Sequence, residues 1–301
     1  MITPTRRAVL LGGVAAVLAG CSAGAAPAGP AVPSGRTVLD PAALDELERR
    51  SGRRIGLVVL DTGTGRAVRH RADTRVLMCS TAKVLIVAAI LRRRLDDPGL
   101  LERTVRYTRA DLLSYAPTTT RSVGTGMTVA ALCEAAIVVS DNTAANLLTG
   151  LLGGPAATTA FVRTLGDPVT RLDRLEPELN ETGPGDERDT STPDAMAADL
   201  RALVLGDALD PPGRDLLTGW MDGATTGTQQ IRAGVPGEWR VGDKTGSGAQ
   251  GESHDIAVAR PPGRAPLVIA VYTTPSDPAS TNGKQTIGEA TRIAVGALWD
   301  T

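Results

Sequence analysis

The spacing of apolar residues changes along the chain, from a strand pattern near both ends to a helix pattern in the middle. Short apolar runs predict four strands, at 54–62, 239–244, 255–259 and 267–273. Helical periodicity dominates from about 95 to 205, and the predicted helices fall at 40–50, 129–139, 143–152, 155–165, 192–205, 211–220 and 285–299. This order predicts an α+β fold, with a sheet built from N- and C-terminal segments beside an inserted helical subdomain at about 80–205.

One further predicted helix, at 84–91, is apolar on every side, which is typical of a buried helix. Ser80 and Lys83 stand at its start, and their spacing would place the amine beside the hydroxyl on a helix. A buried lysine can become a neutral base and activate a serine. Alternatively, Ser80 caps the helix and Lys83 lies at the surface. The S-x-x-K pattern alone does not decide between these interpretations.

The amino-acid composition excludes several classes of partner and cofactor. The chain has 301 residues, of which 42% are hydrophobic, enough for a sizeable core. A formal net charge of −1 argues against a nucleic-acid partner. Two histidines and three cysteines lack zinc spacing, so we expect neither a metal nor another cofactor. Only three of the 32 basic residues are lysines, at 83, 244 and 284, so a lysine is unusual wherever it occurs.

The first 20 residues have the pattern of an export signal, with Arg6-Arg7 followed by a short apolar run. The run ends in Leu18-Ala19-Gly20-Cys21, which resembles the bacterial lipobox, and this resemblance implies lipidation of Cys21. An incidental cysteine beside a cleavage site is the alternative. Residues 21–36 are rich in Ala, Gly and Pro and predict a flexible tether to a domain at 37–301. The chain is thus expected to be exported by the Sec or the twin-arginine route. After export it would be anchored to the membrane by a lipid or released.

Three other stretches carry polar groups that suggest chemistry. Ser140-Asp141-Asn142 follows an apolar run, and Lys244-Thr245-Gly246-Ser247 is expected to end a strand. Arg174 to Asn180, with the sequence RLEPELN, lies in a long loop. Taken singly, these stretches also fit a helix cap, a hairpin turn and an acidic surface loop.

Taken together, S-x-x-K, S-D-N and K-T-G occur in the order that is typical of class A β-lactamases and penicillin-binding proteins. The loop sequence Glu176-Pro177-Glu178-Leu179-Asn180 is similar to that of class A enzymes, and the resemblance extends from about Asp40 to Trp299. It implies an antiparallel sheet with an inserted helical subdomain. It also implies a monomer that hydrolyses the β-lactam amide bond of penicillins and cephalosporins and so gives antibiotic resistance.

The resemblance implies a role for each residue of the motifs. Ser80 would attack the lactam carbonyl, and its proton would pass to Lys83 or, through a water, to Glu176; both bases remain open. Ser140, supported by Lys244, would protonate the departing nitrogen. The backbone N–H groups of Ser80 and Ser247 would hold the oxyanion.

Within the same resemblance, Glu176 and Asn180 would hold the water that cleaves the acyl-enzyme. Arg174 and Asp189 match a pair that closes this loop, so a salt bridge between them is expected. The residues that would bind substrate are Tyr115, Asn142, Thr245, Gly246 and Ser247.

The chain departs from the family pattern at two carboxylate-binding positions. Gln230 and Ser253 stand where many relatives have an arginine, which leaves substrate range and inhibitor susceptibility open and makes Lys284 a possible substitute. Cys133 matches a position that forms a disulfide in some relatives, but its partner position is Val87, so a buried free thiol is expected.

Other functions remain as alternatives at this stage. A penicillin-binding sensor would stay acylated, and a D-Ala-D-Ala carboxypeptidase would be expected to lack the Glu176 loop. A non-catalytic lipoprotein would not need two of its three lysines inside the motifs.

Overall fold

The computed structural model describes Met1, residues 42–183 and residues 185–299. The predicted export signal, Cys21, the tether and the start of the domain at 37 therefore lie outside the described residues. No helix in the described part of the chain is both long and apolar enough to cross a membrane.

A five-stranded antiparallel sheet joins the two ends of the chain, as the apolar pattern predicted. Its strands are β1 (Arg53–Asp61), β2 (Ala67–His70), β7 (Arg240–Ser247), β8 (Ser253–Arg260) and β9 (Leu267–Pro275). Their order in the sheet is β2-β1-β9-β8-β7. The pairing of β1 with β9 brings together residues that are more than 200 positions apart, such as Leu57 and Val271.

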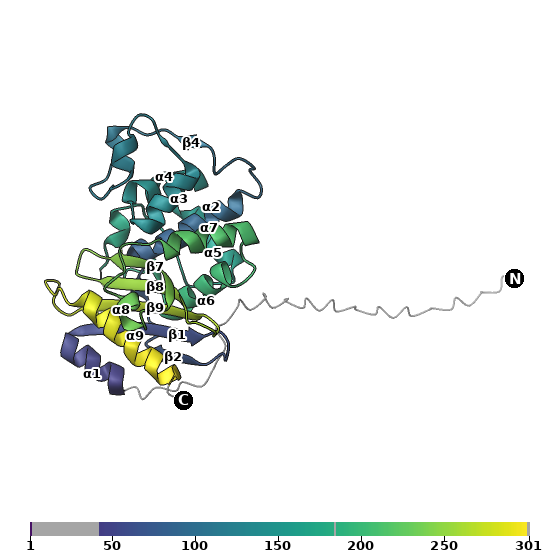
Figure 1. The fold of residues 1–301 in the computed structure, drawn as a ribbon. Helices are drawn as coiled ribbons and strands as arrows, with labels where there is room; N and C mark the ends of the chain where they lie inside the picture. Colours follow the sequence, from purple (N-terminus) through teal and green to yellow (C-terminus); the bar gives the residue numbers. More distant parts are fainter. Residues whose placement is uncertain (2–41, 184, 300–301) are drawn as a thin grey trace.

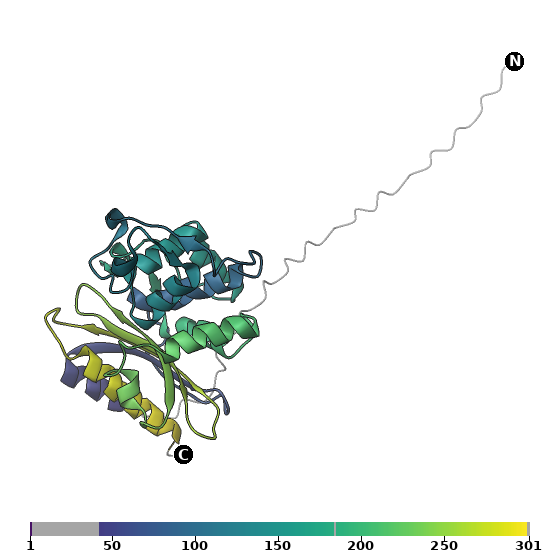
Figure 2. The ribbon, with the colours of Figure 1, turned by 45° about the horizontal axis from the view of Figure 1, so that its top comes forward.

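Both faces of the sheet are covered, so almost every residue of the central strands β1 and β9 is buried. Leu57 and Val59 belong to a core with α1 (Ala42–Ser51) and α9 (Gly283–Trp299). The alternate residues Val58 and Leu60 belong to a second core, which lies under the helices inserted between the strands. Figure 2 shows the sheet between these two layers.

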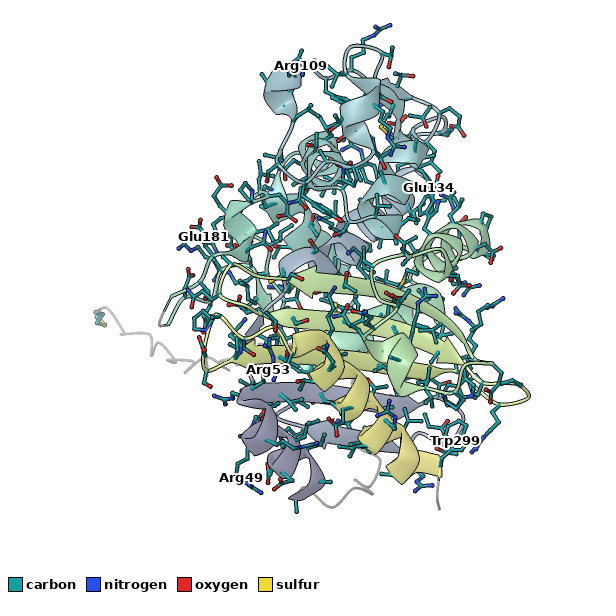
Figure 3. The ribbon with its side chains drawn as sticks, turned by 60° about the vertical axis from the view of Figure 1, so that its left-hand side comes forward. Arg49, Arg53, Arg109, Glu134, Glu181 and Trp299 are labelled. Atoms are coloured by element: carbon teal, nitrogen blue, oxygen red, sulfur yellow. The ribbon has the colours of Figure 1, made fainter. Side chains whose placement is uncertain are left out.

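The inserted helices form one packed group around α2 (Lys83–Arg93). Residues 83–91 of α2 are all buried, so the prediction of a buried helix is confirmed. Around it lie α3 (Val129–Val138), α4 (Asn142–Leu152), α5 (Pro155–Thr164) and α7 (Pro211–Asp222). α6 (Pro193–Val204) packs on the sheet and against α7, and the short α8 (Ile231–Gly234) packs with α9. Figure 3 labels Arg109 at the far end of this group and Arg49, on α1, at the opposite end of the molecule.

The structure corrects four local expectations. Ser80 lies in a 3₁₀ turn, Cys79–Ala82, and the α-helix begins only at Lys83. The strand predicted at 239–244 continues to Ser247 as β7, so the K-T-G motif forms the end of this strand, as expected, but belongs to the strand itself. Residues 95–128 hold no α-helix; they form irregular chain, two 3₁₀ turns at Arg109–Asp111 and Thr119–Ser122, and the short β4 (Thr104–Val105) and β5 (Met127–Thr128). Strand β2 was not predicted, because four residues give too short an alternation to recognise.

Candidate active site

The Ser80 hydroxyl is presented by a strained turn at the start of α2. Cys79 has a φ of 48°, which is uncommon for a residue other than glycine. Side-chain hydrogen bonds stabilise this turn, because the Thr81 hydroxyl lies 2.7 Å from the carbonyl of Met78 and 3.1 Å from the hydroxyl of Tyr272. A 3₁₀ turn has three residues per turn, so it aligns Ser80 with Lys83 more directly than an α-helix would.

Lys83 is the centre of the site. Its Nζ donates to Ser80 Oγ at 2.9 Å and to Asn142 Oδ1 at 2.5 Å, and it lies 3.0 Å from Glu176 Oε1. It also contacts the Ser140 carbonyl at 2.8 Å and hydroxyl at 3.2 Å. The side chain is 1% exposed, and burial lowers the pKa of Lys83, although the charge of Glu176 opposes this shift. The structure therefore places this lysine where its proton can be exchanged with Ser80 or with Glu176.

The Glu176 carboxylate approaches Ser80 from a separate loop. Ser80 Oγ donates to Glu176 Oε1 at 3.3 Å, and Asn180 donates to the other oxygen of that carboxylate at 2.5 Å. Asn146 on α4 holds the backbone of Glu176 on both sides, because its amide donates to the Glu176 carbonyl at 2.8 Å and its Oδ1 accepts from the Glu176 N–H at 2.9 Å. Glu176 is therefore held by hydrogen bonds both at its backbone and at its carboxylate.

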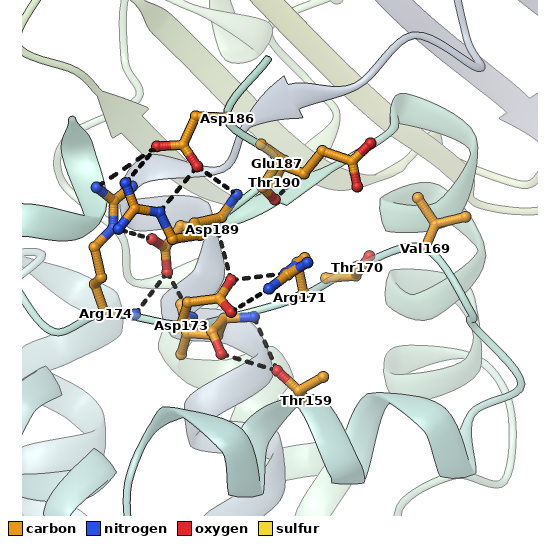
Figure 4. A network of polar contacts seen from close by, with 12 residues as sticks. Thr159, Val169, Thr170, Arg171, Asp173, Arg174, Asp186, Glu187, Asp189 and Thr190 are labelled. Carbon is orange, nitrogen blue, oxygen red and sulfur yellow. Dashed lines mark hydrogen bonds and ion pairs between the residues drawn. The ribbon is translucent and has the colours of Figure 1, made fainter. Parts of the chain in front are cut away.

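A cluster of ion pairs closes this loop at its base, as Figure 4 shows. Arg174 Nε lies 2.5 Å from Asp189 Oδ2, which confirms the predicted salt bridge. Asp189 is fully buried and also accepts from the backbone N–H groups of Asp173 and Arg174. The Asp173 carboxylate in turn accepts from the Asp189 N–H at 3.1 Å. The segment at the start of the loop, Asp173-Arg174, and Asp189 at its end are therefore joined by reciprocal hydrogen bonds.

We expect Arg174→Ala to loosen this loop and slow turnover. Removal of one partner leaves the Asp189 carboxylate buried without its cation, a change that costs about 3 kcal/mol. Displacement of Glu176 should lower kcat by roughly tenfold or more. Thermal unfolding and steady-state kinetics measure the two effects. Arg188→Ala is the matched control, because Arg188 is 54% exposed and pairs with Asp186 at the rim of the loop. Equal effects of the two substitutions would contradict this role of Arg174.

The opposite wall of the site is strand β7. Lys244 Nζ donates to Ser140 Oγ at 3.0 Å, and the Thr245 hydroxyl lies 2.7 Å from that of Thr226. Lys244 has no exposed surface, so burial, together with the nearby charge of Lys83, lowers its pKa to about 7. Gly246 is needed for close approach, since a Cβ there would lie 3.0 Å from the Met78 carbonyl.

A cavity of about 500 Å³ joins these walls, a size that suits a small ligand. Its lining includes these predicted site residues: Ser80, Tyr115, Ser140, Asn142, Asn180, Thr245, Gly246 and Ser247. Tyr115 is 50% exposed, so its ring is available at the cavity. Lys83, Glu176 and Lys244 are buried immediately behind these residues. The structure brings together every catalytic and substrate-binding residue that the sequence predicted.

The cavity also shows what the sequence missed. Thr225, Thr226 and Thr228 line it without a predicted role. Asn146 was missed as the residue that fixes Glu176, although its spacing of four from Asn142 places both on one face of α4. Gln230 donates to the carbonyl of His254 at 3.1 Å and lies 3.4 Å from Ser253 Oγ, so the two replaced arginine positions contact each other.

The two cysteines in the described part of the chain are free and buried. Cys133 has no exposed surface, which confirms the expectation of a buried thiol there. Burial raises the pKa of both thiols, so neither is a ready nucleophile.

A serine that contacts both a buried amine and a carboxylate, at the bottom of a cavity between a sheet and a helical layer, defines a serine acyl-transfer enzyme with a means to activate water. The β-lactamase enzyme family model matches residues 41–298. The chain therefore belongs to this family, and its solved relatives place it in class A.

Individual relatives agree. The chain is 54% identical to β-lactamase AST-1 of Nocardia asteroides, over 84% of this chain and 82% of the relative. It is 45% identical to the carbapenem-hydrolysing β-lactamase KPC of Klebsiella oxytoca, over 97% of each. It is also similar to the solved class A β-lactamase from Mycobacterium abscessus, with a TM-score of 0.84 and 56% identity, over 87% of this chain and 99% of that one. The predicted α+β fold class is confirmed.

Proposed function

We propose that the chain hydrolyses β-lactams through an ester formed on Ser80 and cleared by a water that Glu176 activates. Hydrolysis of these antibiotics confers resistance. The observation that carries the mechanism is the contact of one hydroxyl with an amine and a carboxylate, because Ser80 Oγ accepts from Lys83 at 2.9 Å and donates to Glu176 at 3.3 Å. Either group is within reach of the proton that Ser80 must lose.

In acylation, the Ser80 oxygen attacks the lactam carbonyl as its proton leaves. Ser140 then delivers a proton to the nitrogen of the opening ring, because its hydroxyl is held between Lys83 at 3.2 Å and Lys244 at 3.0 Å. These two amines lower the cost of a transient negative charge on the Ser140 oxygen. The backbone N–H groups of Ser80 and Ser247 stabilise the carbonyl oxygen.

In deacylation, a water held by Glu176 and Asn180 attacks the ester. Glu176 accepts its proton, and Asn180 keeps the carboxylate in position through the 2.5 Å hydrogen bond. This second step separates a hydrolase from a sensor that remains acylated.

Recognition of the substrate carboxylate is assigned to Thr245, Ser247, Lys244 and Lys284. Lys284 is the only charged residue that lines the cavity within the described chain. Gln230 and Ser253 provide no cation of their own. An exposed lysine at the mouth of the cavity supplies the missing positive charge.

We expect Lys284→Gln to raise KM about threefold for a carboxylate-bearing lactam and to leave kcat unchanged, because an exposed charge contributes modestly to binding. Steady-state kinetics at low ionic strength measures the change. Lys284→Arg should retain the wild-type KM, and a lactam with an esterified carboxylate should not distinguish the variants. An unchanged KM for Lys284→Gln would remove this residue from substrate binding.

Export and lipidation are part of the proposal. The support is the order of the N-terminal sequence: paired arginines, a short apolar run and the lipobox-like segment before Cys21. The mature chain would then act outside the cytoplasm as a monomer on a flexible tether. Mass spectrometry of the membrane fraction, with Cys21→Ser as the comparison, tests for the lipid.

Turnover of a chromogenic cephalosporin tests the function as a whole. We expect sustained hydrolysis by the wild-type protein and none by Ser80→Ala. A single stoichiometric burst would indicate a penicillin-binding sensor, and cleavage of a D-Ala-D-Ala peptide instead would indicate a carboxypeptidase.

A further inference from the structure

We propose that Asp45, Glu48 and His70 form a binding site for a divalent transition-metal ion of the zinc class. The site lies at the contact between α1 and β2. In the sheet, β2 forms one edge and β7, which borders the catalytic cavity, forms the other. Figure 1 shows α1 and β2 at the end of the molecule opposite the helical layer. The proposed site is therefore separate from the catalytic one.

The geometry suits a metal ion. One ligand atom from each of the three side chains lies within 4.8 Å of the others. His70 Nε2 is 3.3 Å from Glu48 Oε1 and 3.9 Å from Asp45 Oδ1. Two ligands on a tetrahedral zinc ion, each bound at roughly 2 Å, lie about 3.3 Å apart. The Asp45 side chain is 59% exposed, so it is free to close the remaining gap.

His70 gives an independent reason to expect a ligand. Its side chain is only 8% exposed, and Nε2 is buried without a hydrogen-bond partner. Buried polar atoms are usually paired, and an imidazole nitrogen directed between two carboxylates is a favourable metal ligand. A metal ion would satisfy this nitrogen and both acidic groups at once.

The Glu48 carboxylate is held in position by the backbone of the neighbouring strand. Its Oε1 accepts from the Ile55 N–H at 2.7 Å, which fixes its position between helix and sheet. Carboxylates that ligate metals are commonly oriented by such additional contacts.

Arg71 competes for the same carboxylate. Its Nε and Nη2 lie 2.9 and 2.7 Å from the two oxygens of Glu48. The arginine side chain is 39% exposed, so it can turn toward solvent when an ion enters. An ion would then replace the guanidinium as the positive charge beside Asp45 and Glu48. Removal of Arg71 should therefore strengthen metal binding, whereas removal of a ligand should weaken it.

The test is calorimetric titration of the chelator-treated full chain with Zn²⁺, together with Co²⁺ absorption in the visible range. We expect one ion per chain with micromolar affinity. His70→Gln and Asp45→Asn should each weaken binding roughly tenfold or more, and Arg71→Gln should tighten it severalfold. Only one other histidine exists, and His254 is fully buried, so the loss in His70→Gln identifies the ligand.

Glu46→Gln is the matched control, because Glu46 lies on the same helix, is 49% exposed and pairs with Arg49. It should bind Zn²⁺ like the wild type. β-Lactam turnover should stay at the wild-type level in all of these variants. The proposal is overturned if the wild type binds no Zn²⁺ stoichiometrically, or if His70→Gln binds it as tightly as the wild type and shows the same Co²⁺ spectrum.

Discussion

Glu176→Ala should still be acylated by a good substrate but should release product about 10³-fold more slowly than the wild type. Lys83 remains in this variant as an acceptor for the Ser80 proton, so the ester can form. The water that cleaves it loses its base, and general-base catalysis contributes two to four orders of magnitude in such steps. Rapid-quench kinetics should show a burst equal to the enzyme concentration, and mass spectrometry of the intact protein should show a covalent adduct.

The loop offers a close control for this experiment. Glu178 is exposed and lies two residues further along the same loop. Glu178→Ala should keep the wild-type rate, because Glu178 does not line the cavity that contains Ser80. Wild-type steady-state turnover by Glu176→Ala would show that the deacylation base is a different group.

Lys83→Met should fail at the earlier step. The substitution keeps an unbranched chain of similar volume in a buried position, so packing should be largely preserved. It removes the amine that contacts Ser80, Ser140 and Glu176 within 3.2 Å. We expect the rate of acylation to fall by about 10³-fold or more, measured as formation of the adduct in single-turnover experiments.

Lys83→Arg separates charge from proton transfer. Arginine retains the positive charge but cannot serve as a neutral base. If the role of Lys83 is only electrostatic, this variant should acylate at close to the wild-type rate. If the amine must give up its proton, both variants should be slow, and the result would decide between the two bases that the geometry leaves open.

The layout of the fold could be predicted because it follows from apolar spacing. Helices α3 to α6 begin and end within two residues of the predicted limits, since caps such as Thr128 and Asp141 mark their starts. A sheet shared by the two ends of the chain followed from the presence of strands at both ends, whereas the particular pairing of β1 with β9 is known only from the structure. These features are encoded locally or by simple burial.

The differences arise where tertiary contacts override local pattern. The 3₁₀ turn at Ser80 is stabilised by a hydrogen bond between the hydroxyl groups of Thr81 and Tyr272. Tyr272 lies 191 residues further along the chain than Thr81. Strand β7 continues through Gly246 because β8 supplies hydrogen-bond partners as far as Ser247, paired with Ser253. Neither the Thr81–Tyr272 hydrogen bond nor the pairing of β7 with β8 can be recognised from the local sequence alone.

The site was predictable to a different degree. The motifs supplied the reactive groups, since Ser80, Lys83 and Glu176 are chemically required. The residues that position them were less visible. Asn146 acts through backbone hydrogen bonds to a loop 30 positions away, which no local pattern reveals. Lys284 was named from the sequence as a substitute for the missing arginines, and the cavity lining places it at the site.

The position of β9 has a consequence for biosynthesis. This strand joins β8 to β1, so the wall that carries Lys244 is connected to the N-terminal strand only after residue 267 has left the ribosome. A chain interrupted before that point would hold all the reactive groups and yet lack a framework to align them. A fragment lacking the last strand and helix should therefore be inert toward antibiotics.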